Sequence, residues 1–186
     1  MISSTGALAT LLTGSVVAIR TAGGSGTGIV WDDGLIVTNA HCVPNSGAVH
    51  VDSRGKAYSG ELIACARDHD LALVRIPLLR GARLELRSAE TIRVGELVFA
   101  HGHPLGIRDS LAMGVVHALA RHPRSGQPRF VVADVRLAPG NSGGPLVDTN
   151  GRLLGVNSMV VNGLGVAIPT DAVVRFIERA RAKHVA

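Results

Sequence analysis

The sequence predicts an all-β architecture, either a barrel or a sandwich, with one long helix at the C-terminal end. Short apolar runs separated by Gly, Pro, Asp or Asn recur along the whole chain, which is typical of strands joined by tight turns. The 186 residues include 23 Gly, a content that favours turns over long helices. Apolar residues follow a long helical spacing only near the end, at Ala172, Val173, Phe176, Ile177 and Ala180.

The apolar runs indicate where the strands lie. Thr5–Leu12 is expected to form a short helix or arm, and Ser15–Arg20 the first strand. At the other end, Pro169–Asp171 supplies the start signal of the C-terminal helix. The further predicted strands cover residues 28–31, 35–38, 48–51, 71–76, 97–100, 114–117, 130–133, 153–156 and 165–168.

Charge and hydropathy argue against two classes of function. The net charge is +5, and the Arg residues that carry most of it are scattered, without a basic run or interleaved aromatic residues. We therefore expect no nucleic-acid partner. No apolar run reaches the roughly 18 residues that a membrane span requires, so no span is predicted.

The residues that commonly bind metals do not form a metal site in this sequence. Cys42 and Cys65 match neither a metal-ligand spacing nor a disulfide framework. We expect two free, partly buried thiols, and a single bridge between them stays open. His101 and His103 suggest a metal pair, but no matching third and fourth ligand follows. We predict no metal and no cofactor.

The strongest local signal is a Gly-rich turn around Ser142, within residues 139–146. Glycine allows the backbone to approach a substrate closely. A serine hydroxyl is a weak nucleophile, so it needs a base that takes its proton and donors that stabilise the oxyanion. The segment Gly140, Asn141 and Ser142 would form that oxyanion hole, through the N–H groups of Gly140 and Ser142. A purely structural turn is the alternative.

His41 and Asp70 are the candidates for the base and for the acid that orients it. His41 follows a predicted strand, although a lone histidine in such a place is more often structural. Asp70 directly precedes the apolar run 71–76, where a buried carboxylate is costly unless it is paired. An imidazole Nδ1–H is one such partner, and it fixes the tautomer that a base needs. Asp68 is the rival acid, and a plain turn aspartate is the alternative role.

Taken together, these residues and their surroundings resemble the trypsin-like serine proteases, and most closely the protease domain of the HtrA/Deg family. Their order along the chain is His, Asp, Ser, as in that family. The matching segments cover nearly the whole chain from about residue 15 to the last helix. They are residues 24–30, 34–41, 70–73, 102–106, 139–146, 155–159 and 165–171.

The resemblance implies a trypsin-like double six-stranded antiparallel β-barrel with a C-terminal helix, forming one protease domain. An N-terminal arm and the first barrel would span residues 1–80, a connector 81–92, the second barrel 93–168 and the helix 169–186. The catalytic triad of His41, Asp70 and Ser142 would lie in the cleft between the barrels. The substrate backbone would pair with Asn157, Ser158 and Met159 as an added strand.

The resemblance also bears on specificity. In trypsin-like enzymes the residue six positions before the nucleophile lies at the base of the main pocket, and here it is Arg136, followed by Leu137. A buried Arg would attract an acidic substrate side chain. Alternatively, Arg136 turns outward or pairs with Asp134. Because HtrA-type pockets are usually apolar, we expect a preference for small aliphatic side chains.

Three departures from the family pattern affect regulation and assembly. Asn141 replaces the Asp that pairs with a freed N-terminus in many zymogens, so activation by N-terminal cleavage is not expected. The family usually carries a PDZ domain after the protease domain, whereas this sequence ends at Ala186. We expect no PDZ-mediated regulation unless such a domain was removed. The N-terminus lacks the aromatic residues of the family trimer, so monomer and trimer both stay open.

We therefore predict a serine endopeptidase that hydrolyses peptide bonds of proteins through an acyl-enzyme. Its partners would be protein or peptide substrates, unfolded ones included, and the family suggests a role in protein quality control. The first alternative is a peptide-binding module of the same fold with latent or weak catalysis, and the second is a scaffold for polyanions. Localisation stays open: cytoplasmic if Met1 is the native start, extracytoplasmic if an export signal was trimmed.

Overall fold

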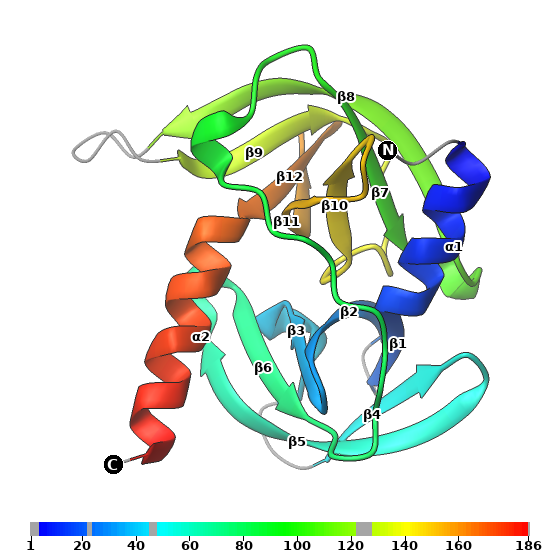
Figure 1. The fold of residues 1–186 in the computed structure, drawn as a ribbon, viewed down its shortest axis with the longest axis vertical. Coiled ribbons are helices and arrows are strands. Elements are labelled where there is room, and N and C mark those ends of the chain that lie inside the picture. Colours follow the sequence, from blue (N-terminus) through cyan, green and yellow to red (C-terminus); the bar gives the residue numbers. More distant parts are fainter. Residues whose placement is uncertain (1–3, 22–23, 45–47, 122–127, 186) are drawn as a thin grey trace.

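The computed structural model describes residues 4–21, 24–44, 48–121 and 128–185. It contains two closed antiparallel barrels of six strands each, one above the other in Figure 1. The strand order is β1-β2-β3-β6-β5-β4 in barrel 1 and β10-β11-β12-β9-β8-β7 in barrel 2. These barrels and the C-terminal helix confirm the predicted fold class.

Ten of the twelve strands in the described residues coincide with apolar runs that were predicted as strands, and most of these are longer than predicted. Residues 56–66 and 145–148 also form strands, which were not predicted. Barrel 1 consists of β1 (Val16–Thr21), β2 (Gly24–Asp32), β3 (Leu35–Thr38), β4 (Ala48–Ser53), β5 (Lys56–Ala66) and β6 (Leu71–Arg75). Barrel 2 consists of β7 (Leu97–Gly102), β8 (Ser110–Arg121), β9 (Pro128–Asp134), β10 (Pro145–Asp148), β11 (Leu153–Val161) and β12 (Leu164–Pro169). Short 3₁₀ helices interrupt the connections: η1 (Ala40–Cys42), η2 (Arg67–His69), η3 (Ala89–Thr91) and η4 (Pro104–Gly106).

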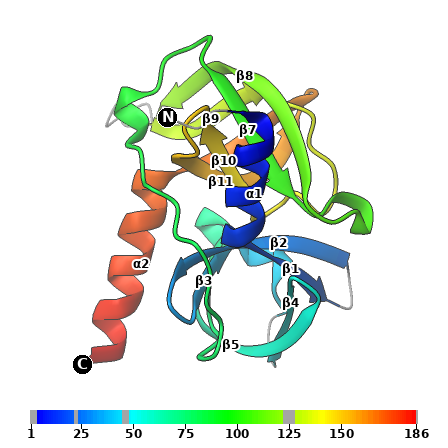
Figure 2. The same ribbon diagram turned by 45° about the vertical axis from the view of Figure 1, so that its right-hand side comes forward.

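Two α-helices lie against the barrels. Helix α1 (Thr5–Ser15) begins after Ser4, whose Oγ accepts a hydrogen bond from the N–H of Ala7 as an N-cap. It runs beside barrel 2 to the start of β1, as Figure 2 shows. Helix α2 (Thr170–Val185) contacts β5 and β6 of barrel 1 as well as β11 and β12 of barrel 2. Among the helices within the described ranges, none is both long and apolar enough to cross a membrane.

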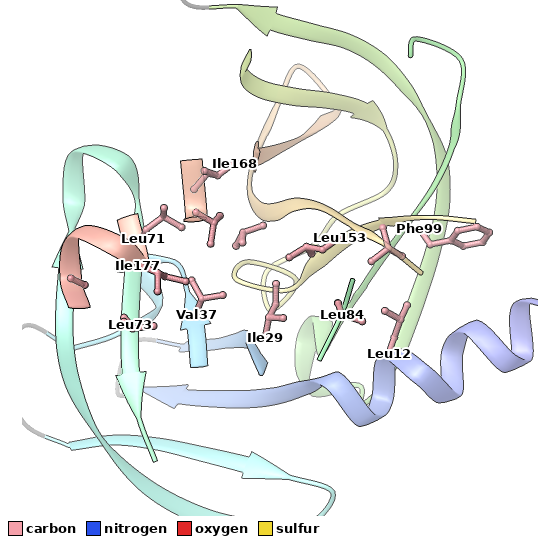
Figure 3. Close-up of a cluster of buried hydrophobic side chains, with 14 of the residues drawn as sticks. Leu12, Ile29, Val37, Leu71, Leu73, Leu84, Phe99, Leu153, Ile168 and Ile177 are labelled. Carbon is pink, nitrogen blue, oxygen red and sulfur yellow. The ribbon is translucent and has the colours of Figure 1, made fainter. Parts of the chain in front are cut away.

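A shared apolar core joins the barrels and both helices (Figure 3). Each barrel also has a core of its own. Burial of a large aliphatic side chain contributes about 1.5–3 kcal/mol, so this shared cluster fixes how the barrels pack. Its members come from both barrels, the connector, α1 and α2: Leu8, Leu12, Ile29, Val37, Leu71, Leu73, Leu84, Phe99, Val147, Leu153, Val156, Ile168, Val173, Ile177 and Ala180.

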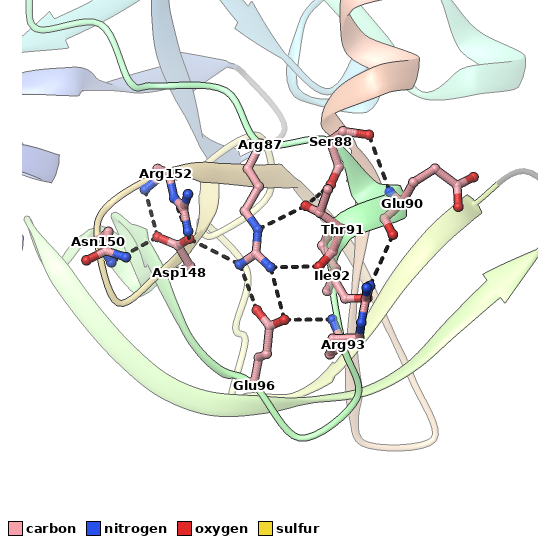
Figure 4. A network of polar contacts seen from close by, with 10 residues as sticks. All are labelled: Arg87, Ser88, Glu90, Thr91, Ile92, Arg93, Glu96, Asp148, Asn150 and Arg152. Atoms are coloured by element: carbon pink, nitrogen blue, oxygen red, sulfur yellow. Dashed lines mark hydrogen bonds and ion pairs between the residues drawn. The ribbon is translucent and has the colours of Figure 1, made fainter.

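An ion-pair network ties the connector between the barrels to the β10–β11 turn (Figure 4). Arg87 donates to both carboxylate oxygens of Glu96, at 2.7 and 3.0 Å, and to Asp148 at 3.2 Å. Asp148 is buried and also accepts from Arg152 Nε at 2.8 Å and from the N–H groups of Asn150 and Arg152. Burial alone would raise the pKa of Asp148, but the hydrogen bonds from Arg152 and Asn150 keep it below 3.8. The hydrogen bonds and ion pairs therefore offset the cost of burying this charged carboxylate.

A substitution at Leu153 tests how much the shared core contributes to stability. It is 0% exposed at the junction of the barrels, so truncation to Ala should lower the free energy of unfolding by about 2–5 kcal/mol through lost burial and a new cavity. Urea unfolding followed by tryptophan fluorescence measures this change. Leu78, which is 80% exposed, is the matched control, and Leu78→Ala should change the free energy by less than about 0.5 kcal/mol. Equal losses in both variants would contradict the assignment.

Candidate functional site

His41 and Asp70 meet at one end of barrel 1. His41 lies in η1 after β3, and Asp70 lies between η2 and β6. Because β3 pairs with β6, with Thr38 opposite Ala72, the segments that flank these strand ends are neighbours. His41 Nδ1 lies 2.9 and 3.0 Å from the two carboxylate oxygens of Asp70. The backbone N–H of His41 also donates to Asp70 Oδ1 at 3.1 Å.

The backbone of Asp70 is held in an unusual conformation. Its φ of 50° places it in the left-handed region, which only glycine adopts easily. The side-chain amide of Asn39 donates to the carbonyl of Asp70 at 2.9 Å. This bond and the three contacts with His41 stabilise the strained residue, with its carboxylate facing the imidazole.

The contact between these side chains shifts both of their pKa values. The hydrogen bond with Asp70 raises the pKa of His41 well above 6.5, the neighbouring Cys42 adds to this rise, and burial opposes it. Burial would raise the pKa of Asp70, but the hydrogen bonds from His41 and Ser158 lower it below 3.8. The ionised carboxylate therefore stabilises a positive charge on the imidazole.

Ser142 lies in a turn that requires glycine on both sides. Gly140 has a φ of +106° and Gly143 a φ of +83°, conformations that other residues rarely adopt. A Cβ at Gly140 would also clash with the carbonyl oxygen of His103, and one at Gly143 with that of Thr27. The two glycines therefore allow the turn to pack directly against barrel 1 and the β7–β8 loop.

Thr27 of β2 holds this turn from the other barrel. Its N–H donates to the carbonyl of Ser142 at 2.8 Å, and its Oγ1 donates to the carbonyl of Gly140 at 2.7 Å. Its own carbonyl accepts from Thr38 Oγ1 at 2.7 Å, and the residue is fully buried. No pattern in the sequence singled out Thr27. Its position between two glycines, Gly26 and Gly28, is the one local feature that could have pointed to a buried polar contact, and this signal is weak.

Ser158 joins Asp70 to Ser142. Its Oγ donates to Asp70 Oδ2 at 2.6 Å, and its carbonyl accepts from Ser142 Oγ at 3.2 Å. The β11–β12 register shifts between Asn157 and Met159, which places Ser158 in the irregularity. Within the described residues, no hydrogen bond links Ser142 Oγ directly to His41, so the three predicted side chains meet through Ser158.

The backbone donors around Ser142 differ in what they bind. The N–H of Asn141 donates to the carbonyl of Ala138 at 2.9 Å, so it is already used. The N–H groups of Gly140 and Ser142 have no intramolecular acceptor in the described part of the chain. The predicted segment 140–142 therefore contains two free donors, and Asn141 is not a third.

A pocket of about 340 Å³ lies beside Ser142, and its walls are mainly apolar. Leu137, Met159 and Val160 contribute the larger apolar side chains. Arg136 is exposed and does not line this pocket, so the structure does not bring it to the site. The full lining is Leu137, Ala138, Pro139, Asn141, Ser142, Asn157, Ser158, Met159 and Val160.

Asn157 plays a different part from the one expected. Its N–H donates to the carbonyl of Gly144, and its carbonyl accepts from the N–H of Gly143, both at 2.8 Å. Its side-chain amide donates to the carbonyl of Pro145 at 2.9 Å. Both backbone groups thus support the Ser142 turn, and among the three residues expected to pair with a substrate, Ser158 and the exposed Met159 are left for that role.

The cysteines and the buried histidine pair were the residues considered for a metal site. Both thiols are free as expected, but Cys42 is buried and Cys65 is exposed, whereas both were expected to be partly buried. His101 and His103 are buried, and burial lowers the pKa of both. Within the described ranges, no group of three or more His, Cys, Asp or Glu side chains is placed to bind a metal ion.

The comparisons with known proteins agree with the double-barrel fold. The family model described as a trypsin-like peptidase domain matches residues 26–156. The chain is 36% identical over 175 residues to the mitochondrial serine protease HTRA2 of Drosophila grimshawi, covering 89% of this chain and 41% of that protein. It is 33% identical over 164 residues to a probable periplasmic serine endoprotease, DegP-like, of Chlamydia trachomatis, covering 83% and 33%. It therefore spans well under half the length of these relatives.

Among solved structures, the chain resembles the HtrA-type protease AlgW with a tripeptide. The TM-score is 0.85 at 26% sequence identity, and the match covers 94% of this chain and 62% of that one.

The effect of Asp70 on His41 can be measured directly. Replacing Asp70 with Asn removes the negative charge and should lower the pKa of His41, because burial then acts without its compensation. An NMR titration of the His41 imidazole measures the shift. Asp68→Asn is the matched control, since Asp68 lies two residues away in η2 and should leave the titration unchanged. A pKa of His41 that is equal in both variants would exclude the pairing with Asp70.

Proposed function

The chain belongs to the trypsin-like peptidase family, in its HtrA group, and on that premise we propose that it is a serine endopeptidase acting through Ser142, His41 and Asp70. One observation carries the proposal. His41 Nδ1 contacts both oxygens of Asp70 at 2.9 and 3.0 Å, in a site that Ser158 connects to Ser142. This arrangement suits a base that is oriented by an acid next to a nucleophile.

His41 acts as the general base. With Nδ1–H donated to Asp70, the lone pair of Nε2 is available to take the proton of Ser142. The Ser142 hydroxyl, which donates to the carbonyl of Ser158, turns about its Cα–Cβ bond to face Nε2 when substrate binds. Such catalytic hydrogen bonds often form only in the substrate complex. The carboxylate of Asp70 stabilises the imidazolium that forms, and the imidazolium then returns the proton to the leaving amine.

The free N–H groups of Gly140 and Ser142 form the oxyanion hole. They stabilise the negative charge that develops on the scissile carbonyl oxygen when Ser142 attacks. Loss of one such donor costs roughly 10²–10³ in turnover in other hydrolases. The role of Asn141 is to close the turn through its bond with Ala138. Water then releases the acyl-enzyme, with His41 acting as base again.

The pocket beside Ser142 favours an uncharged aliphatic side chain. Leu137, Met159 and Val160 offer apolar contacts, and none of the described residues that line the pocket is charged. A charged substrate residue would lose its hydration there without gaining a partner. The exposed β11 edge from Met159 to Val161 provides the surface along which an extended peptide would pair. Extended, apolar segments of unfolded proteins meet both requirements, which fits a role in protein quality control.

One observation favours a second candidate, a peptide-binding module with latent catalysis. Ser142 Oγ donates to the carbonyl of Ser158 rather than to His41, which leaves the nucleophile without its base. If the hydroxyl stays there when peptide is bound, the site binds substrate without cutting it. The two candidates differ in whether Ser142 acylates.

Labelling with a fluorophosphonate probe separates these candidates. We expect rapid covalent labelling of the wild type and none of Ser142→Ala. Peptidase turnover should fall by about a millionfold in both Ser142→Ala and His41→Ala, because these residues act as one unit. Ser110→Ala, in β8, is the control for the loss of a hydroxyl elsewhere and should keep full activity. Full peptidase activity in Ser142→Ala would refute the assignment.

A peptide library tests the pocket. Cleavage should follow small aliphatic residues, since Leu137, Met159 and Val160 line the pocket and Arg136 does not. Arg136→Gln should leave the cleavage profile unchanged, whereas Leu137→Glu should abolish cleavage after aliphatic residues. Mass spectrometry of the products gives the profile. Dominant cleavage after Asp or Glu, lost in Arg136→Gln, would show that Arg136 controls specificity instead.

A further inference from the structure

The orientation of the Gly140 N–H depends on a contact outside the Ser142 turn. The carbonyl of Pro139 accepts a hydrogen bond from the N–H of Leu105 at 2.9 Å. Because the peptide bond is planar and trans, the N–H of Gly140 must point away from Leu105 while that carbonyl is held. Rotation of this one peptide would remove a donor from the oxyanion hole. The β7–β8 loop, residues 103–109, therefore controls the donor.

This loop is strained and has little apolar packing. Leu105 has a φ of 53° and Asp109 a φ of 55°, both in the left-handed region. The side chains of Leu105 and Ile107 are 74% and 63% exposed, so burial does little to hold them. Strained backbone persists only where other contacts stabilise it. Polar contacts must supply that stabilisation here.

The loop is held at both ends by hydrogen bonds. At its start, the N–H of His103 donates to Thr27 Oγ1 at 3.1 Å. Near its end, the guanidinium of Arg108 binds both carboxylate oxygens of Asp52, at 2.6 and 2.7 Å. Asp52 lies in β4 of barrel 1, and its Oδ1 also accepts from the N–H of Gly55. The far end of the loop is thus attached to the β4–β5 turn.

Bidentate geometry makes this pair stronger than an ordinary surface ion pair. Arginine and carboxylate match in two parallel hydrogen bonds, which fixes direction as well as distance. The Asp52 side chain is 13% exposed, which limits screening by solvent, while that of Arg108 is 44% exposed. The hydrogen bonds from Arg108 lower the pKa of Asp52 to about 2, so the carboxylate is ionised at neutral pH.

We propose that Asp52 and Arg108 are positioning residues for the oxyanion hole: their ion pair anchors the 103–109 loop to barrel 1, so that Leu105 holds the Pro139–Gly140 peptide with its N–H available to substrate. The inference rests on the proposed function, because it assigns that N–H to oxyanion stabilisation. Barrel 1 thereby contributes to the site twice, once through His41 and Asp70 and once through this anchor.

The test compares acylation rates by a fluorophosphonate probe, together with kcat and KM for a peptide substrate. Arg108→Gln and Asp52→Asn should each lower the acylation rate and kcat about three- to fivefold, the upper range for a partly exposed ion pair, with KM changing less than about twofold. Arg108→Lys should lose less, because it keeps the charge. The double variant should be no slower than the slower single variant, since both changes break the same contact.

Arg83→Gln is the matched control. Arg83 forms an ion pair with Asp32, an aspartate of barrel 1 outside the site, and its loss should leave acylation unchanged. Urea unfolding of all variants separates a positioning effect from general destabilisation. The proposal fails if Arg108→Gln acylates as fast as the wild type, if Arg83→Gln slows acylation equally, or if the effects of Arg108→Gln and Asp52→Asn multiply in the double variant.

A second readout does not depend on catalysis. Hydrogen exchange of the Leu105 amide, followed by NMR, should be severalfold faster in Arg108→Gln than in the wild type and unchanged in Arg83→Gln. If labelling of the wild type does not depend on Ser142, the proposed function fails. Hydrogen exchange at the Leu105 amide then still tests, by itself, whether the Asp52–Arg108 ion pair holds the 103–109 loop. Equal exchange rates at the Leu105 amide in the wild type and in Arg108→Gln would show that the ion pair does not anchor the loop.

Discussion

The contact of Thr27 with the Ser142 turn is the constraint on which the site depends. This one buried residue of barrel 1 binds the carbonyls of Gly140 and Ser142, which belong to barrel 2. Buried hydrogen bonds tolerate little displacement, because a broken one leaves unpaired polar groups away from water. The two barrels therefore cannot slide past each other without breaking the turn. Packing in the shared apolar core holds the two barrels together, and the hydrogen bonds of Thr27 fix the position of one barrel relative to the other.

Strain and compensation occur together around this contact. Asp70 and Leu105 both have left-handed backbones, and each touches the site, one through its carboxylate and the other through its N–H. Asp70 is stabilised by hydrogen bonds from Asn39, His41 and Ser158. A strained backbone persists only where surrounding contacts stabilise it, and the many hydrogen bonds around these two residues provide that stabilisation. The apolar interiors of the barrels do not depend on comparable networks of polar contacts.

Much of the fold could be predicted because its signals are local. Alternation of apolar runs and turn residues marked ten of the twelve described strands, all except β5 and β10, and helical spacing marked α2. Helix α1 extends to Ser15, three residues beyond the predicted Leu12, because its end is set by the start of β1 rather than by a stop signal. The family resemblance was needed to choose a double barrel over a sandwich, since strand patterns alone do not determine pairing.

By itself, the sequence determined ten of the twelve described strands, the glycines of the Ser142 turn and three candidate side chains, because residue type and short spacing carry that information. Only the tertiary structure decided that Ser158 joins Asp70 to Ser142, that Asn157 supports the turn and that Arg136 lies outside the pocket. These outcomes depend on a register shift in β11 and on contacts between residues far apart in the chain. No local pattern encodes such contacts, because they form only when both barrels have closed and packed.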